Sequence, residues 1–351
     1  MGRRGRTETF LELHLDLLKE DHIPLLWYLF SADALGAEGT FEKLLSDSKD
    51  YATSLGERLR ERVYQDAIPQ LATALVAAQS LKSPTQQDLD STYHMALTLL
   101  FRILFIAYGE DKDLLPYRTN DLYRARSFKQ KAREMVRIRE ESTEFDTNSF
   151  DHWDDAVRLF EAVNGGSREL GVPEYNGGLF SKDSQVSRTG AALSGLRLSN
   201  SAFGPVLTYI LVDESQEGLG PVDFRSLGVR EFGTIYEGLL ESELSIAETD
   251  LIVDKEGVYK PANGTEPHVR SGDVYIHNKS GARKASGSYF TKAFAVDHLL
   301  DHSLEPALDE HTTRLGTLDA VEAGKAFFDF RVADIAMGSG HFLVAAVDRI
   351  E

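Results

Sequence analysis

The sequence contains no cysteine among its 351 residues. Disulfide bonds and thiolate metal sites are therefore excluded. This composition is compatible with a reducing cytoplasm, and we expect the protein to be cytoplasmic.

Long hydrophobic runs are also missing. The most apolar run, residues 95–108, contains Arg102 and is shorter than the roughly 20 residues that a membrane-spanning helix requires. The basic N-terminus, residues 1–6, is followed by Glu12 and Asp16, where a signal peptide needs an uninterrupted apolar core. The sequence therefore predicts neither a membrane segment nor a secretory signal.

Positive charge is scarce, since 38 Lys and Arg stand against 56 Asp and Glu, for a formal net charge of −18. Contacts to DNA phosphates require clustered cations, so the chain alone is expected to bind DNA weakly. One stretch is basic, with Arg124, Arg126, Lys129, Lys131, Arg133, Arg137 and Arg139. Its aromatic residues Tyr123 and Phe128 would suit nucleic-acid contact. We favour a solvated helix face paired with the acidic stretch 140–155.

Apolar residues recur at helical spacing over residues 7–81. Gly36 and Gly39 are predicted to separate helices there. The long segment 54–79 carries Leu59, Val63, Ile68, Leu71 and Leu75 at helical spacing. A capping box with Ser83 as the N-cap then predicts a new helix. That helix is apolar nearly all round as far as Tyr108, so we expect it to be a buried spine that ends near Gly109.

Length and composition fit an ordinary globular protein of about two domains, with 42% hydrophobic and 27% charged residues. After Ser245 the helical period fades, and short strands are predicted at 250–259 and 273–278. We predict a helical domain over 1–244, a small β connector over 245–285, and the start of a further domain over 286–351.

The C-terminal region contains the pattern on which the functional prediction depends. The apolar run 327–333 predicts a buried strand, and 342–347 predicts a helix. Between them lie Asp334 and a turn with Gly338 and Gly340. Glycines let a backbone approach a ligand closely, and a helix N-terminus favours an anionic group. The third glycine of a dinucleotide fingerprint is replaced by Leu343, and Asp334 is badly placed for a phosphate. This combination favours S-adenosylmethionine over NAD or FAD.

Residues 334–344 resemble motif I of the adenine-N6 DNA methyltransferases of the type IIG restriction and phage-defence group. Ile335 stands where that family normally has proline. Residues 283–292, followed by a predicted helix over 294–308, resemble motif X, again with Lys292 in place of a usual proline. Segments 99–116, 175–180 and 227–241 are similar to helical signatures of the same family, and we interpret the last two as packing elements. The resemblance covers nearly the entire chain.

The resemblance implies a mainly α N-terminal domain followed by the first βα unit of an α/β Rossmann-like methyltransferase domain. It implies methyl transfer from S-adenosyl-L-methionine to adenine N6 in double-stranded DNA. The implied cofactor-binding residues are Tyr289, Phe290, Thr291, Asp334, Ala336, Met337, Gly338, Gly340 and Phe342. No catalytic and no metal-binding residue is carried over.

The sequence has no Asn-Pro-Pro-Tyr motif to hold a flipped adenine. The acidic residue that would bind the ribose hydroxyls is absent as well. We therefore expect a fragment, a split-gene product or one half of a complementing pair, inactive alone and completed by a second polypeptide. The alternative is a non-catalytic helical interaction module of a restriction or defence complex.

Two further patterns have ordinary structural interpretations. Glu110 and Lys112 have the Glu-x-Lys spacing of metal-dependent nucleases, but they follow a helix, whereas such nucleases carry the pair on a strand. His298 and His302 lie one helical turn apart and could pair on a metal. Without a third ligand at a sensible spacing, two ordinary helix histidines are favoured.

Overall fold

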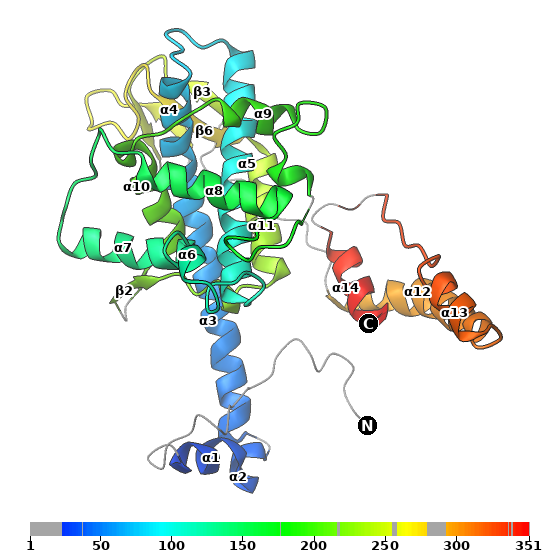
Figure 1. The fold of residues 1–351 in the computed structure, drawn as a ribbon. Helices are drawn as coiled ribbons and strands as arrows, with labels where there is room; N and C mark the ends of the chain where they lie inside the picture. Colours follow the sequence, from blue (N-terminus) through cyan, green and yellow to red (C-terminus); the bar gives the residue numbers. More distant parts are fainter. Residues whose placement is uncertain are drawn as a thin grey trace. The chain divides into compact units, whose positions relative to one another are not determined.

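The computed structural model describes residues 23–36, 38–175, 177–215, 218–254, 258–278, 293–335, 337 and 340–350. These residues are mainly helical, with a few short strands (Figure 1). The chain divides into two compact units, Met1–Glu57 and Arg58–Glu351, and each is described by itself.

The first unit contains α1 (Ile23–Phe30), α2 (Ala32–Leu35) and most of α3 (Thr40–Arg62). The break that Gly36 and Gly39 predicted is confirmed, because α2 ends before them and α3 begins after them. A Cβ atom at Gly39 would lie 2.4 Å from the Ala34 carbonyl oxygen, so only glycine fits there. The predicted helical positions Leu11, Leu15 and Leu18 lie outside the described residues.

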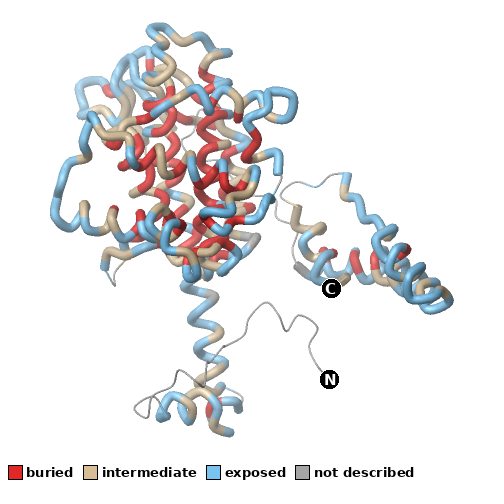
Figure 2. Tube along the Cα trace, in the orientation of Figure 1, coloured by how far each residue is buried: buried red, intermediate tan, exposed pale blue. Residues whose placement is uncertain are grey.

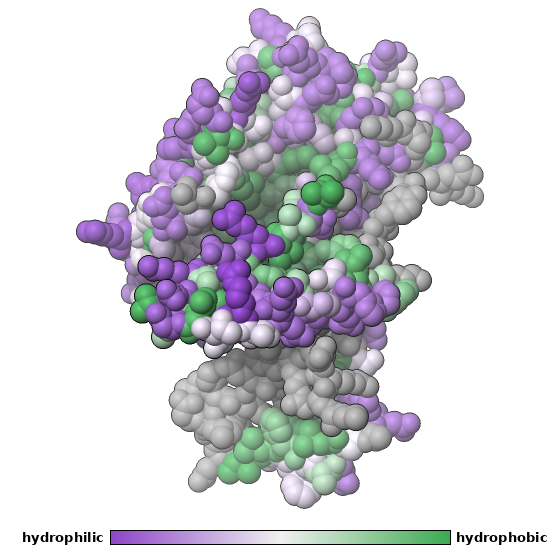
Figure 3. Space-filling view, turned by 90° about the vertical axis from the view of Figure 1, so that its right-hand side faces the viewer, coloured by the Kyte–Doolittle hydropathy of each residue, from purple (hydrophilic) through white to green (hydrophobic). Residues whose placement is uncertain are grey.

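Helix α1 exposes a large share of its apolar side chains, with Trp27 76% exposed and Tyr28 57% exposed. Figure 3 shows this apolar surface as the green group at the lower end of the view. No described residue of α1 is buried.

The second unit begins with one long helical rod. It continues α3 through a π-helical turn, η3 (Val63–Ala67), into α4 (Ile68–Ala78). The amide of Ile68 donates to the carbonyl of Val63, five residues earlier. Pro69 follows at once and has no amide hydrogen to continue the regular pattern, which accounts for the wider turn. The segment 54–79 is thus helical as predicted, with this local change of pitch.

The N-cap of helix α5 (Gln86–Asp111) lies two residues later than the predicted cap. This N-cap is Thr85, not Ser83. The Thr85 hydroxyl accepts from the Asp88 amide, and the Asp88 carboxylate accepts from the Thr85 amide at 2.8 Å. This reciprocal pair satisfies two helix-terminal donors, and it prevails over the Ser83 alternative.

The prediction that this helix forms a buried spine is confirmed (Figure 2). Helix α5 is long and apolar enough to cross a membrane by length and composition, but 72% of its most apolar window is buried inside the protein. It ends at Asp111, two residues beyond Gly109. A Cβ atom at Gly109 would lie 3.1 Å from the Leu115 side chain, so Leu115 packs closely against this glycine.

The remaining elements of the helical region surround α4 and α5. They are α6 (Asp121–Arg124), α7 (Phe128–Glu140), α8 (Asp151–Gly165), η4 (Gly178–Phe180), α9 (Arg188–Ser194), α10 (Asn200–Leu211), η5 (Phe224–Ser226) and α11 (Val229–Leu240). An antiparallel pair that the sequence did not predict, β1 (Val212–Ser215) with β2 (Gly218–Pro221), follows α10.

The two signatures interpreted as packing elements both pack against α5. The ring of Phe180 lies edge-on to Phe105, with centroids 5.3 Å apart. On the α11 side, the rings of Phe101 and Tyr236 are 5.4 Å apart. The Tyr93 hydroxyl donates to the Leu239 carbonyl at 2.6 Å. Segments distant in sequence are therefore held together by one helix.

Short antiparallel strands occupy the predicted β region. Strand β3 (Ser242–Ile246) pairs with β6 (Val274–Asn278), with Leu244 opposite Ile276, and β4 (Leu251–Val253) pairs with β5 (Tyr259–Pro261). The strand predicted at 273–278 is confirmed by β6. The range predicted at 250–259 contains only β4 and the first residue of β5, with Asp254 outside both, and β3 begins three residues before Ser245.

The C-terminal region contains α12 (Ala293–Leu315), α13 (Ala320–Phe327) and α14 (His341–Ile350). The helices predicted at 294–308 and 342–347 are confirmed. The strand predicted over 327–333 is wrong, because Phe327 ends α13 and the residues after it form turns and coil. The amide of Asp329 donates back to the Ala326 carbonyl, which completes the helix end.

This correction has a physical reason. A buried parallel strand needs neighbouring strands on which to form its hydrogen-bond ladder. Within the described ranges no strand lies C-terminal to Asn278, so the apolar run 328–333 has no such partner. The described residues therefore do not form the Rossmann-like sheet that the sequence predicted.

Candidate functional site

A glycine turn leads into α14, at the position where the sequence places motif I. Gly340 adopts a φ of 81°, and its amide donates to the Met337 carbonyl at 2.8 Å. The Gly340 carbonyl accepts from the Val344 amide at 3.0 Å, so Gly340 caps the helix. The nearest atom to a built Cβ is 3.9 Å away, so the positive φ, and not lack of space, favours glycine here.

A cavity of about 440 Å³ lies beside this turn. Its wall is contributed by α12, by the segment 330–335 and by the first residues of α14. Most of the lining is apolar, and the polar residues in it are Asp334, Arg331 and Ser303. The volume lies within the range of small-molecule sites, which is about 300–1,000 Å³.

Packing between α12 and α14 holds the cavity together. Val296, Leu300 and Leu304 form one stripe along α12 and are buried against Ala346 of α14, with Phe342 packed on the same cluster. Residues four apart share a helix face, which accounts for the stripe. The cavity is therefore backed by a small apolar core.

A charged clamp lies beside that core. The Arg349 guanidinium donates to Asp301 at 2.6 Å, to Glu305 at 2.9 Å and to Asp297 at 3.1 Å. These three carboxylates form the next stripe along α12. Their hydrogen bonds raise the pKa of Arg349 above its ordinary value, with the bond to Asp301 as the largest cause. The clamp fixes α14, and hence Phe342, against α12.

The structure brings together some of the predicted cofactor residues. Asp334 and Phe342 line the same cavity, while Met337 and Gly340 form the adjoining turn. Tyr289, Phe290, Thr291, Ala336 and Gly338 lie outside the described residues. The sequence interpretation missed the contribution of α12, namely Leu299, Ser303 and Leu304. The signal was present, since these residues recur at helical spacing directly after motif X.

The cavity offers three kinds of recognition. Asp334 provides a carboxylate, half-buried at the wall, for an amino group. Arg331 provides a cation for a carboxylate. The Ser303 hydroxyl donates to the Leu299 carbonyl, so only its oxygen remains, as an acceptor. Apolar side chains make up the rest. The arrangement fits a ligand that combines an amino-acid end with a less polar body.

Glu110 and Lys112 do not form a nuclease site. The Glu110 side chain is buried and accepts from the Tyr123 hydroxyl at 2.9 Å and from the amides of Phe128 and Lys129 at 3.1 and 2.7 Å. The Lys112 ammonium lies over the Tyr108 ring. In the part of the chain that is described, no group of three or more histidine or acidic side chains is placed to hold a metal.

Most cations of the basic stretch around α7 are paired. Lys129 bonds to Asp111 at 2.5 Å, and Arg139 bonds to Glu214 at 2.6 Å. The other pairs are Arg124 with Asp121, Arg126 and Lys131 with Asp155, and Arg133 with the Tyr117 hydroxyl. Most of these cations are paired with acidic side chains, but the favoured pairing with residues 140–155 is confirmed for Asp155 alone.

Comparison with known proteins gives no relative: no protein-family model, no curated protein and no solved structure matches this chain.

Proposed function

We propose that this chain is part of an S-adenosylmethionine-dependent methyltransferase that acts on adenine N6 of DNA in a restriction or phage-defence system. The observation that carries the proposal is the glycine turn from Met337 to Gly340 at the start of α14, beside a cavity whose wall includes Asp334. The resemblance of residues 334–344 and 283–292 to motifs I and X supports it.

The cavity chemistry is the second support. The methionine end of the cofactor carries an ammonium and a carboxylate, for which Asp334 and Arg331 are complementary. In the proposed reaction adenine N6 attacks the methyl carbon, the sulfonium leaves as a thioether, and N6 loses a proton. The partners are double-stranded DNA and a second polypeptide with an Asn-Pro-Pro-Tyr motif, in the cytoplasm.

Ligand-observed NMR on the untagged full chain tests the cofactor site, because saturation-transfer signals report weak binding. We expect signals from the methionine end of S-adenosylmethionine, and we expect Gly340→Val to abolish them. Gly264→Val is the matched control. Gly264 also has a positive φ, 88°, and a Cβ atom there would meet no atom within 4 Å, but this glycine lies between β5 and β6. Absence of any signal with the natural chain would contradict the proposal.

A methylation assay tests the proposal that a second polypeptide supplies the adenine-binding motif. With labelled cofactor and mixed-sequence DNA, the chain alone should give background counts, because the adenine-binding motif is not in its sequence. Addition of a polypeptide that carries the motif, for example from the adjacent downstream reading frame, should give labelled N6-methyladenine. Methylation by the chain alone would show that the adenine pocket has been assigned to the wrong polypeptide.

A non-catalytic interaction module is the second candidate. It is favoured by the apolar side chains that remain accessible between α13 and α14, including Phe328, 81% exposed, and Ile335, fully exposed. Such a module would bind a protein partner and not the cofactor. The NMR experiment separates the two functions, because the module predicts no signal in either the natural chain or the variants.

A further inference from the structure

Helix α12 presents two histidines on the side opposite its buried stripe. His298 and His302 are four positions apart, and both are exposed. Each lies two positions after a member of the buried Val296–Leu300–Leu304 stripe, which is about 200° around an α-helix. The pair therefore faces away from α14, and the hollow around it shares Leu299 and Ser303 with the wall of the cavity beside Asp334.

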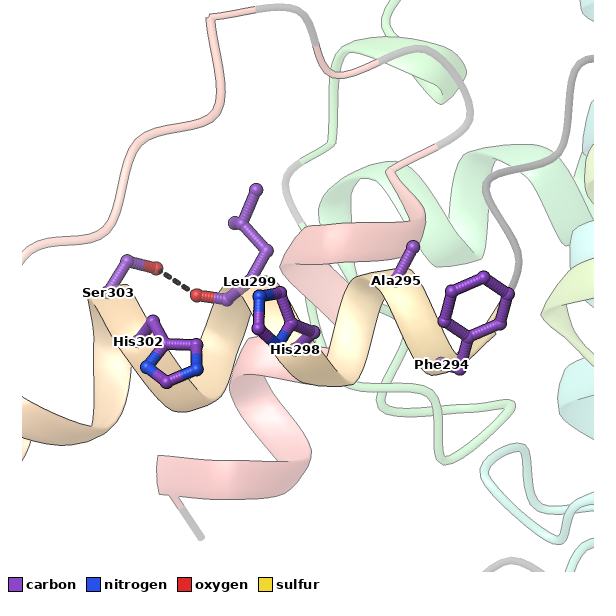
Figure 4. A pocket seen from close by; sticks show the side chains of 6 residues that line it. All are labelled: Phe294, Ala295, His298, Leu299, His302 and Ser303. Carbon is purple, nitrogen blue, oxygen red and sulfur yellow. Dashed lines mark hydrogen bonds between the residues drawn. The ribbon is translucent and has the colours of Figure 1, made fainter.

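The two rings lie next to each other (Figure 4), with centroids 4.4 Å apart and ring planes at 73°. Two imidazole nitrogens about 2.1 Å from one ion place their ring centres roughly 4.5–5 Å apart. The observed separation is just below this range, so rotation of the two side chains could bring one nitrogen of each ring to the same ion. Zinc-binding helices use the same spacing of two histidines.

Both rings are also available to a ligand. Among the described residues neither imidazole makes a hydrogen bond or an ion pair, and the two rings lie against each other. The hollow in which they lie is lined by Phe294, Ala295, Leu299 and Ser303. The Ser303 hydroxyl is occupied, because it donates to the Leu299 carbonyl at 2.7 Å.

We infer that His298 and His302 chelate a divalent late transition-metal ion, of the class of Ni²⁺, Cu²⁺ and Zn²⁺, which prefer imidazole ligands. The chain supplies two ligands, and water or an external donor fills the other positions. In zinc proteases with this spacing the residue after the first histidine is a glutamate that acts as the base. Here that residue is Leu299, so the site binds a metal and lacks the hydrolytic base.

Calorimetric titration of the untagged chain with Ni²⁺ and with Zn²⁺ at pH 7.5 tests the inference. We expect one ion per chain, or one ion per two chains if a second copy supplies the remaining ligands. His298→Ala and His302→Ala should each reduce binding to the background of the double variant. His94→Ala is the matched control, because His94 is a single exposed histidine on α5, and it should bind as the natural chain does.

Two further readouts keep the test independent of folding and of methyltransferase activity. Ni²⁺ should broaden the NMR signals of both imidazoles before those of other histidines. Lowering the pH should weaken binding, because only neutral imidazole binds a metal. The circular dichroism of the variants should be unchanged, since both side chains are exposed. Titrations that are identical for the natural chain and the double variant would overturn the inference.

Discussion

The hydroxyl of Tyr123 donates a buried hydrogen bond of 2.9 Å to Oε1 of Glu110. The same carboxylate accepts the first amides of α7, from Phe128 and Lys129. Glu110 at the end of α5 therefore caps a second helix through tertiary contact. Burial raises the pKa of Glu110 to about 7, although the hydrogen bonds from Lys129, Tyr123 and Phe128 act in the opposite direction.

The raised pKa of Glu110 predicts a pH dependence of stability. Between pH 4.5 and 7 the folded protein keeps a proton on Glu110 that the unfolded chain loses, so this group's contribution to the free energy of unfolding falls as pH rises. A shift of this size corresponds to roughly 3 kcal/mol. We expect the difference in unfolding free energy between the natural protein and Glu110→Gln to decrease by about that amount from pH 4.5 to 8.

Chemical denaturation at several pH values measures this difference. Glu231→Gln is a suitable control, because Glu231 caps α11 through the Gly228 amide at 2.9 Å but is accessible to solvent. A plot of the unfolding free energy of this variant against pH should run parallel to that of the natural protein. If the plot for Glu110→Gln also runs parallel, the proton on Glu110 is not linked to folding.

The close packing around Gly190 predicts that a side chain at this position destabilises the protein. The Arg102 guanidinium, buried in α5, donates to the Leu179 carbonyl at 2.8 Å and to the Ser181 carbonyl at 3.3 Å. A Cβ at Gly190 would lie 2.0 Å from the Ser181 oxygen and 2.8 Å from the Arg102 guanidinium. Gly190→Ala must therefore displace α9 or break the Arg102 contact, and we expect a loss of about 2–3 kcal/mol in unfolding free energy.

Gly195→Ala provides the control for this substitution. Gly195 follows α9 in a right-handed helical conformation, and the nearest atom to its built Cβ is 3.6 Å away. Its stability should change by less than about 1 kcal/mol, in either direction. Equal stabilities of the two variants in thermal or denaturant unfolding would contradict the packing of Gly190 against Arg102.

Local sequence patterns predicted the helices better than they predicted the contacts. Helices α5, α12 and α14 follow from apolar spacing, and the break at Gly36 and Gly39 follows from backbone freedom. The clasp of the 178–181 loop by Arg102 joins residues 77 positions apart, for which no local pattern exists. The predicted cap at Ser83 was displaced because Thr85 finds a reciprocal partner in Asp88.

In the candidate site, too, local features could be predicted from the sequence and long-range contacts could not. The position of the glycine turn was evident from sequence, because the turn depends on local backbone freedom. The strand at 327–333 was predicted from apolar residues that would equally suit a helix end and its exit, and only neighbouring strands could decide between them. The α12 wall of the cavity depends on how two helices pack, which the spacing of Val296 and Leu300 suggests but does not assign to a partner.

Neutralisation of the basic stretch predicts weak DNA binding. Because its cations are engaged with Asp111, Asp155 and Glu214, few remain for phosphates, and the net charge of −18 repels the duplex. At physiological salt we expect a dissociation constant at or above the micromolar range of non-specific contacts. A gel mobility shift with the chain alone measures this.

The control for DNA binding removes two exposed cations of α7. The double variant Arg133→Ala/Arg137→Ala should show the same weak affinity as the natural chain. A nanomolar shift that this double variant weakens would show that the α7 face is a DNA-binding surface.

The ion pairs of Arg349 predict a contribution to the stability of α14 against local opening, and with it of the cavity wall at Phe342. The Arg349 guanidinium joins Asp297, Asp301 and Glu305, which would otherwise be three like charges at helical spacing. Arg349→Met keeps an apolar stem of similar length and removes the charge. Because the carboxylates are partly exposed, we expect a modest loss of about 1 kcal/mol. Local opening of α14 should then be about fivefold more frequent.

Amide hydrogen exchange of α14 measures this opening directly. The difference between the natural chain and Arg349→Met should shrink at high salt, because salt screens the charges of the clamp. Arg314→Met, at an exposed position in the last turn of α12, should leave α14 exchange unchanged. If Arg349→Met exchanges like the natural chain, the apolar contacts of Leu300 and Ala346 alone hold α14. The cavity wall would then depend on packing and not on the charged clamp.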